Sequence, residues 1–333
     1  MTVRRVAALL AAGTLMLGGL LSGCGGDRSA QQAEQAARSG DGTAAAGRRL
    51  SIATGNTTGV YYVLGGGLAD QIGRHLPGHQ ATAEATGASV ENVQRVVRGD
   101  SDIAFTLADT AADAVAGKGA FTAPQPIRAL ARLYDNSTQV VAATASGVTS
   151  IAGLRGKRVS TGSPNSGTEV IALRLLKAAG LDPDKDVDRQ ALGLPESVQA
   201  LKDGDLDALV WSGGLPTPGI TDLFTSLKGK VAFVPLDAVL PAMRAEHGEV
   251  YAEGTIAKDV YGTPADVSTI AVPNLLVVNE TMDPALAGSL TKLIFDRKAD
   301  LEKVHPAAGD ITRDNAPRTG PVPLHDGAKG YYG

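Results

Sequence analysis

The chain has 333 residues, of which 31 are lysine or arginine, 35 are aspartate or glutamate, and one is cysteine. At about 150 residues per domain, this length predicts two domains. A formal net charge of −4 argues against a nucleic-acid-binding protein, which would carry a basic excess. The single cysteine excludes an internal disulfide framework and a cysteine-based zinc site.

The first 24 residues have the pattern of a secretory signal. Arg4 and Arg5 precede an uncharged, largely apolar run over residues 6–21, which ends at Leu-Ser-Gly-Cys with the lone cysteine at Cys24. This ending resembles the bacterial lipobox, in which the cysteine becomes the lipid-modified first residue of the mature protein. We expect a lipoprotein anchored to the membrane through Cys24, outside the cytoplasm. An uncleaved anchor is the alternative, since about 20 apolar residues can span a bilayer.

Residues 25–48 are rich in Gly, Ala, Gln, Ser and Arg and lack aliphatic periodicity, which is typical of a flexible tether. The folded part is therefore expected to begin near Leu50. From there on, short apolar runs alternate with helical patterns, which predicts βαβ units and mainly parallel sheets.

Two stretches of the chain repeat one another. A short strand and a Gly-containing loop at 52–55 lead into a helical pattern, and residues 159–162 do the same 107 positions later. This repetition predicts two similar α/β lobes, with a single large sheet as the alternative. The apolar positions of the two helices are Tyr61, Leu64, Leu68 and Ile72, and then Ile171, Leu175 and Leu176.

Gly-Asp-x-Asp sequences at 99–102 and 204–207 form a second pair, 105 positions apart. Gly99 and Gly204 can adopt positive φ after a helix, and the aspartates can accept hydrogen bonds from turn amides. We interpret both sequences as helix-to-strand turns and not as metal or catalytic sites.

The C-terminal part predicts a strand at 270–278 and one amphipathic helix over 284–305. If the chain leaves the first lobe near Thr144 and returns near Thr269, two strands link the lobes and form a hinge beside a cleft. The predicted organisation is lobe I over 49–144 and 269–333, and lobe II over 145–268.

Three loops between a strand and a helix are rich in Gly, Ser, Thr and Asn, at 54–59, 86–92 and 162–168. Free amides and the dipole at a helix N-terminus attract an anion such as a carboxylate. In α/β sheets such loops lie at the carboxyl ends of strands, where ligands usually bind. The same residue types also simply cap helices. Three such loops in one chain favour a shared site for a small anionic or zwitterionic solute.

No catalytic or cofactor motif fits the chain. Gly162 and Gly167 have the spacing of a phosphate-binding loop, but Thr168 stands where lysine is needed. A proline interrupts the helix that would align His75 and His79 on a metal ion. We therefore expect neither enzymatic activity nor a cofactor or metal.

Two aromatic residues are candidates for a ligand cleft. Trp211 follows an apolar strand and precedes a loop rich in Gly and Pro, and Tyr134 follows an apparent strand at 127–133. Each can line the cleft, while the alternatives are core packing for Trp211 and a position on the rim for Tyr134.

Several short segments recur in one order between Leu50 and Tyr332. They are Thr86-Gly87-x-Ser89-Val90-Glu91-Asn92, Gly99-x-x-Asp102, Leu154-Arg155-Gly156-Lys157-Arg158-Val159, Ser166-Gly167-Thr168, Gly213-Gly214-x-Pro216-Thr217-Pro218 and the stretch 323–332. In this order they resemble the TAXI-type solute receptors of TRAP (tripartite ATP-independent periplasmic) transporters. The resemblance implies a two-lobed, type II-like periplasmic-binding-protein fold of hinge-linked α/β lobes with a central ligand cleft. It also implies a receptor that delivers a small carboxylate, such as glutamate or glutamine, to the TRAP permease in the membrane.

The resemblance further implies that both lobes contact the ligand, and Trp211 joins the set through its own position. The expected contacts are Thr54, Asn56, Thr57, Thr58, Gly59, Tyr61, Thr86, Gly87, Ser89, Asn92, Tyr134, Ser163, Asn165, Ser166, Gly167, Thr168, Trp211, Gly213, Gly214 and Pro216. Family members often have Gly where this chain has Asn56, Thr58, Ala88 and Asn165, so the added side chains narrow the expected cleft.

Three other functions remain open. A substrate-binding lipoprotein of an ABC transporter, of the NMT1, taurine or nitrate type, is built on the same two-lobed plan. A sensor subunit and an enzyme on this fold are the others. A neighbouring gene for an ATPase would favour the ABC alternative, and turnover of a bound ligand would favour an enzyme.

Overall fold

The computed structural model describes residues 48–333, and its first element is strand β1 (Arg48–Ala53). The predicted signal, the lipidation site at Cys24 and nearly all of the predicted tether lie outside this range. Arg48, which was expected in the tether, instead begins β1. Within 48–333, no helix combines the length and the apolar character that a membrane crossing requires.

Two long strands, β4 (Ile127–Ala143) and β10 (Val267–Asn279), run antiparallel to one another through the centre of the sheet. Beyond β10 the order continues with β3 (Ile103–Leu107), β1 and β2 (His79–Glu84). Beyond β4 it continues with β7 (Ala208–Gly213), β5 (Arg158–Ser160) and β6 (Asp188–Gln190). The ten strands are therefore hydrogen-bonded into one sheet, although they serve two lobes. The outer strands pair in parallel as predicted, whereas β3, β10, β4 and β7 pair antiparallel.

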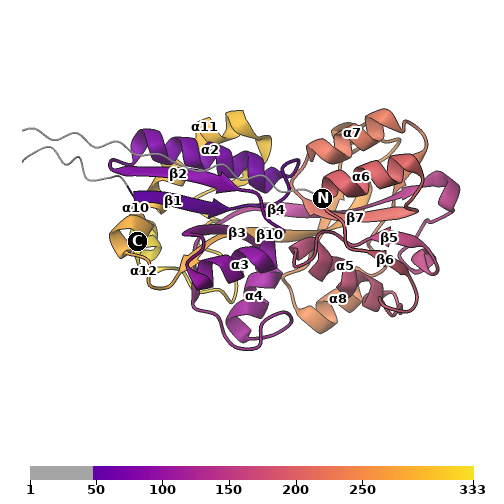
Figure 1. Ribbon diagram of the computed structural model, residues 1–333, viewed down its shortest axis with the longest axis horizontal. Coiled ribbons are helices and arrows are strands. Elements are labelled where there is room, and N and C mark those ends of the chain that lie inside the picture. Colours follow the sequence, from indigo (N-terminus) through magenta and orange to yellow (C-terminus); the bar gives the residue numbers. More distant parts are fainter. Residues whose placement is uncertain (1–47) are drawn as a thin grey trace, which may run out of the picture. The chain divides into compact units, whose positions relative to one another are not determined.

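Figure 1 shows the two lobes on either side of these crossing strands. The predicted boundaries near 144 and 269 fall just after the end of β4 and just inside β10. Lobe I contains α2 (Val60–His75), β2 (His79–Glu84), α3 (Ser89–Arg98), β3 (Ile103–Leu107), α4 (Ala108–Ala116), α10 (Pro284–Asp296), α11 (Lys298–Val304) and α12 (Asp326–Tyr332) besides β1. Lobe II contains β5 (Arg158–Ser160), α5 (Gly167–Ala178), β6 (Asp188–Gln190), α6 (Leu194–Asp203), β7 (Ala208–Gly213), α7 (Pro218–Ser226), β8 (Val231–Phe233), α8 (Leu240–His247), β9 (Ala252–Ile256) and α9 (Lys258–Tyr261).

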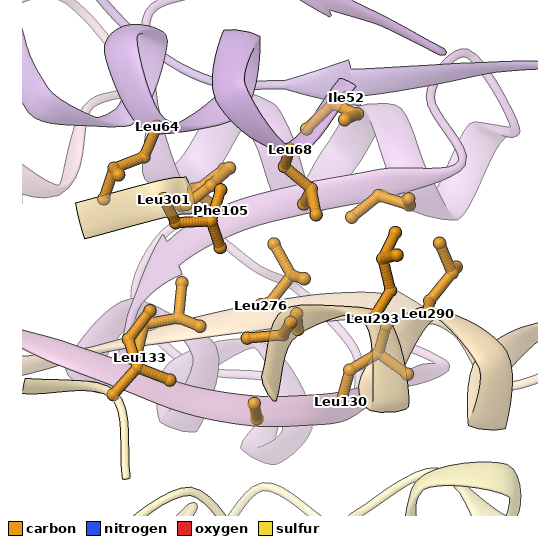
Figure 2. Close-up of a cluster of buried hydrophobic side chains, with 14 of the residues drawn as sticks. Ile52, Leu64, Leu68, Phe105, Leu130, Leu133, Leu276, Leu290, Leu293 and Leu301 are labelled. Carbon is orange, nitrogen blue, oxygen red and sulfur yellow. The ribbon is translucent and has the colours of Figure 1, made fainter. Parts of the chain in front are cut away.

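Each lobe buries apolar side chains on both faces of its part of the sheet. In lobe I, α2, α10 and α11 cover one face and α3 and α4 the other. Figure 2 shows the first of these cores, where Leu64 and Leu68 of α2 and Leu301 of α11 lie against Phe105 and Leu276. In lobe II, α6 and α7 cover one face while α5 and α8 cover the other. The expected architecture of two α/β lobes is confirmed.

The two Gly-Asp-x-Asp turns have the predicted structural role. Gly99 and Gly204 end α3 and α6 with φ of 77° and 82°. Asp102 accepts a hydrogen bond from the backbone amide of Ser51 at 2.9 Å, and Asp207 accepts one from the amide of Arg158 at the same distance. Both aspartates thus fasten the backbone of a neighbouring strand, β1 in lobe I and β5 (Arg158–Ser160) in lobe II.

The predicted helix over 284–305 is wrong in one respect, because it is interrupted at Arg297. This residue has φ −114° and ψ 16°, which end α10 and redirect the chain into α11. The new direction allows Leu301 to enter the core beneath α2, as Figure 2 shows.

Candidate ligand-binding site

A narrow cavity of about 20 Å³, with room for about one water molecule, lies between the two lobes. Lobe I contributes the starts of α2 and α3 and the end of β3, lobe II contributes the start of α5 and the end of β7, and the crossing strand β4 forms part of the wall. Residues of all three predicted loops and both candidate aromatic residues therefore line one space. The expected residues that line it are Asn56, Gly59, Tyr61, Ser89, Tyr134, Ser166, Gly167, Thr168, Trp211 and Gly213.

Six lining residues were not among the expected contacts. They are Gly55, Val60, Ala88, Leu107, Asn136 and Ser212. The first three lie within or next to the predicted loops and differ from the expectation only in detail. Asn136 had an available signal, since a run of polar residues at 135–139 interrupts an otherwise apolar strand.

Several expected contacts instead hold the sheet together. The side-chain amide of Asn92 is buried and donates hydrogen bonds to the carbonyl oxygens of Thr54 at 2.6 Å and Phe105 at 2.8 Å. The hydroxyl of Thr86 donates to the Asn92 side-chain oxygen at 2.6 Å, and that of Thr54 to the Glu84 carbonyl at 2.6 Å. These bonds connect β1, β2, β3 and α3, so the polar side chains are already paired. Thr57, Thr58, Gly87, Ser163, Asn165, Gly214 and Pro216 lie near the cavity in sequence but do not line it.

The start of α3 is occupied by the opposite lobe. The carbonyl oxygen of Asn165 in lobe II accepts hydrogen bonds from the backbone amides of Val90 and Glu91, both at 3.1 Å. Two of the helix's free amides are therefore unavailable to an anion in this closed arrangement. Asn165 has φ 60°, a left-handed conformation that asparagine tolerates better than most residues.

Of the helix N-termini of α2, α3 and α5, that of α2 has the fewest groups that accept from its free amides or balance its dipole. Its N-cap is Gly59, which offers no side-chain hydrogen bond, and the first turn contains no acidic residue. At α5, by contrast, Ser166 accepts a hydrogen bond from the amide of Glu169 at 2.9 Å, and the Glu169 carboxylate lies in the first turn. Helix geometry leaves the amides of Val60, Tyr61, Gly167 and Thr168 without an intrahelical acceptor.

Two tyrosines add hydroxyl groups to the cavity wall. Tyr134 is 1% exposed, and its hydroxyl has no hydrogen-bond partner, whereas the Tyr61 hydroxyl donates to the side-chain oxygen of Asn274. Asn274 in turn donates to the Asn136 side chain at 2.7 Å, so this network lies on the two crossing strands. Burial raises the pKa of both tyrosines, which therefore remain protonated donors.

Further contacts hold the lobes together around the cavity. The side-chain amide of Asn56 donates to the Ser163 hydroxyl at 3.3 Å, and the backbone amide of Leu194 donates to the Asn56 oxygen at 3.3 Å. A ring nitrogen of His305 lies 3.0 Å from the carbonyl oxygen of Pro216. No set of three metal-ligating side chains occurs within residues 48–333. Both lobes thus direct hydrogen-bond donors into one narrow space, and the lobes must move apart slightly for that space to admit a molecule larger than water.

Comparison with known families gives one match that covers most of the chain. The model of the NMT1-like family matches residues 52–333. The prediction of a TAXI-type receptor is therefore wrong, and so is the predicted TRAP transporter. The segments that suggested it include Asn92, which bonds to the backbone of Thr54 and Phe105, and Gly99, which ends α3. Both residues have structural roles in this chain, so their presence does not identify a transporter class.

Solved structures share the fold at low sequence identity. The binding-protein component of an ABC phosphonate transporter from Pseudomonas aeruginosa matches with TM-score 0.53 and 13% identity, over 79% of each chain. PhnD1 from Prochlorococcus marinus, in complex with methylphosphonate, matches with TM-score 0.52 and 12% identity, over 79% of this chain and 90% of that one. A Xanthomonas citri protein bound to ATP matches with TM-score 0.50 and 14% identity, over 85% and 94%. These likenesses support the two-lobed fold.

Proposed function

The chain belongs to the NMT1-like family, and from this premise we propose that it is the substrate-binding protein of an ABC-type transporter. In this role it captures a small solute outside the cytoplasm and delivers it to a permease in the membrane. The sequence pattern around Cys24 supports attachment to the membrane through a lipid.

One observation carries the proposal: residues of both lobes and of a connecting strand enclose a single cavity. A ligand that contacts both lobes stabilises the closed arrangement relative to an open one, because the open form offers only part of these contacts. The permease can then distinguish loaded from empty protein by the distance between the lobes.

The chemistry of the wall supports binding without turnover. Amides, hydroxyls and apolar groups line the cavity, and no charged or imidazole side chain is found among the lining residues that the structure describes. General acid–base chemistry needs a group that gains or loses a proton near neutral pH. We therefore expect the ligand to leave the site chemically unchanged.

The test combines binding and uptake. Calorimetry of the purified full-length chain against small organic acids and amino acids should yield saturable binding with one site per chain, and the released ligand should be intact. Cells that lack the chain should lose uptake of that ligand, and the uptake should require ATP hydrolysis. Absence of binding at millimolar ligand throughout the panel would contradict the proposal, as would uptake that persists without ATP.

A further inference from the structure

The charge of the cavity wall restricts the ligand that can enter it. All lining residues within 48–333 are uncharged, and several, such as Val60, Leu107 and Trp211, are apolar. A buried ammonium group without a carboxylate partner is strongly unfavourable because it loses its hydration. A zwitterionic amino acid would bring such a group into the cavity.

Asp109 is a carboxylate close to this wall, two residues beyond Leu107, but it is already compensated. Its side chain is fully buried, accepts a hydrogen bond from the Tyr251 hydroxyl at 2.6 Å and lies 3.5 Å from Arg174. Its other oxygen accepts from the backbone amide of Thr110 at 2.6 Å. Asp109 does not line the cavity, so it offers no free acceptor to an ammonium group.

The two acidic residues in the first turns of α3 and α5 are engaged as well. Glu91 accepts from the backbone amide of Gly87 at 2.7 Å. Glu169 accepts from the amide of Asn165 at 2.8 Å and from Arg189 at 2.9 Å. Neither carboxylate lines the cavity.

The groups left without partners are hydrogen-bond donors. The free amides at the start of α2 and α5 face the cavity region, where the helix dipoles favour negative charge. Tyr134 adds a second, independent sign, because its hydroxyl is buried, lines the cavity and has no partner in the described structure. Leaving a buried hydroxyl unpaired is unfavourable. A phenol hydroxyl can donate or accept, and beside the free amides of α2 and α5 an acidic oxygen of the ligand, which accepts from all of these groups, is the expected partner.

We infer that the ligand is a compact organic anion without an ammonium group, whose acidic oxygens accept from the amides of Val60 and Tyr61 and from the Tyr134 hydroxyl. The apolar part of the ligand packs against Leu107 and Trp211. This inference rests on the proposed function and narrows it to a substrate class, which excludes free amino acids.

The decisive experiment compares pairs of ligands that differ only in the ammonium group. Suitable pairs are butanoate and 2-aminobutanoate, ethanesulfonate and taurine, and ethylphosphonate and 2-aminoethylphosphonate, each titrated calorimetrically into the full-length chain. We expect the member without ammonium to bind at least about 100-fold more tightly, a difference of about 2.8 kcal/mol at about 1.4 kcal/mol per factor of ten. Equal or tighter binding of an aminated member would overturn the substrate class and leave the proposed function intact. Failure of all pairs at millimolar concentration would contradict both.

The variant Tyr134→Phe tests the role of the hydroxyl separately. It should weaken binding of the preferred anion about tenfold or more, while the ligand-free melting temperature stays the same or rises because an unpaired buried group is removed. Tyr332→Phe is the matched control, since the Tyr332 hydroxyl donates to the Leu130 carbonyl at 2.9 Å away from the cavity. The control should show the opposite signature, a lower melting temperature with unchanged affinity. Unchanged affinity in Tyr134→Phe would overturn the assigned contact.

Discussion

Arg174 of lobe II reaches across the interface to Asp109 of lobe I, and its guanidinium lies 3.5 Å from a carboxylate that is fully buried. Tyr251, also of lobe II, donates its hydroxyl to the same carboxylate, and Arg174 forms a second ion pair with Asp113. Burial raises the pKa of Asp109, while the charge of Arg174 opposes that rise. The buried carboxylate of Asp109 in lobe I is thus compensated by the guanidinium and the hydroxyl of two lobe II side chains.

Replacing Arg174 by methionine should expose this dependence. Asp109 would remain buried with its guanidinium partner gone, so we expect the free energy of unfolding to fall by about 3–5 kcal/mol near neutral pH. Loss of Arg174 also raises the pKa of Asp109 further. A carboxyl whose folded-state pKa is raised contributes stability below its unfolded-state pKa, and this contribution is lost as the pH rises through the folded-state value. The deficit of Arg174→Met should therefore shrink as the pH is lowered from about 8 to about 5, which denaturant unfolding at several pH values can measure.

The control for that experiment is an exposed ion pair in the same lobe. Arg155 pairs with Asp186, and its side chain is 59% exposed. Arg155→Met should change stability by no more than about 1 kcal/mol. A deficit in Arg174→Met that is the same at every pH would show that lost packing, and not the buried carboxylate, causes the destabilisation.

Ala88 provides a second prediction, because it lines the cavity in a strained backbone conformation. Its φ of 85° and ψ of −145° lie in a region that is readily open only to glycine. Ala88→Gly should therefore stabilise the protein by about 1 kcal/mol, even though glycine makes the unfolded chain more flexible.

The same substitution in an ordinary helix should have the opposite sign. Ala299 is exposed within α11, so Ala299→Gly is expected to destabilise the protein by about 1 kcal/mol. Thermal unfolding of both variants checks the pair. A lower melting temperature for Ala88→Gly would mean that the lost methyl contact outweighs the backbone strain.

Gly167 leads to a third prediction, about closure. A Cβ atom at this position would lie 2.6 Å from a methyl carbon of Leu107 and 2.6 Å from the hydroxyl oxygen of Ser89, both across the lobe interface. Gly167→Val should therefore hold the lobes apart and lower ligand affinity by at least about tenfold, which corresponds to about 1.4 kcal/mol. Calorimetry measures the affinity, and small-angle scattering should show a larger radius of gyration.

Gly66 is the matched control, because it tests a side chain introduced at a glycine that has open space around it. A Cβ at this helical position in α2 would meet no atom within 4 Å. Gly66→Ala should stabilise the protein by about 0.5–1 kcal/mol and leave affinity unchanged. If Gly167→Val bound ligand as tightly as the original chain, the described interface would not be the one that closes on the ligand.

The sequence allowed much of this architecture to be predicted, because helix ends and strand periodicity are local properties. Gly99, Gly204 and the apolar positions of α2 and α5 could be assigned from their spacing alone. The sequence could not show which loop amides stay free. The Asn165 carbonyl that accepts from the amide of Val90 at the start of α3 is 75 positions away in the sequence and reaches it only through the tertiary fold. Leu107 and Ser212 reach the cavity through strand register across the crossing strands, for which the sequence carries no local signal. The predicted transporter class was wrong for a related reason. Short Gly- and Ser-rich segments form turns and helix ends, so they indicate the fold and not the transporter that the protein serves.

Trp211 offers a last prediction, because it is the only tryptophan in the chain and lines the cavity. Its indole nitrogen donates to the Thr217 hydroxyl at 3.1 Å, and its ring is largely buried. A ligand that packs against this ring changes the polarity around it. The tryptophan fluorescence should therefore change saturably as ligand is added, with a midpoint at the ligand concentration that calorimetry gives. Gly167→Val should shift both midpoints together, while Gly66→Ala should shift neither. Calorimetric binding without any change in emission would place the ligand away from Trp211 and so outside this cavity.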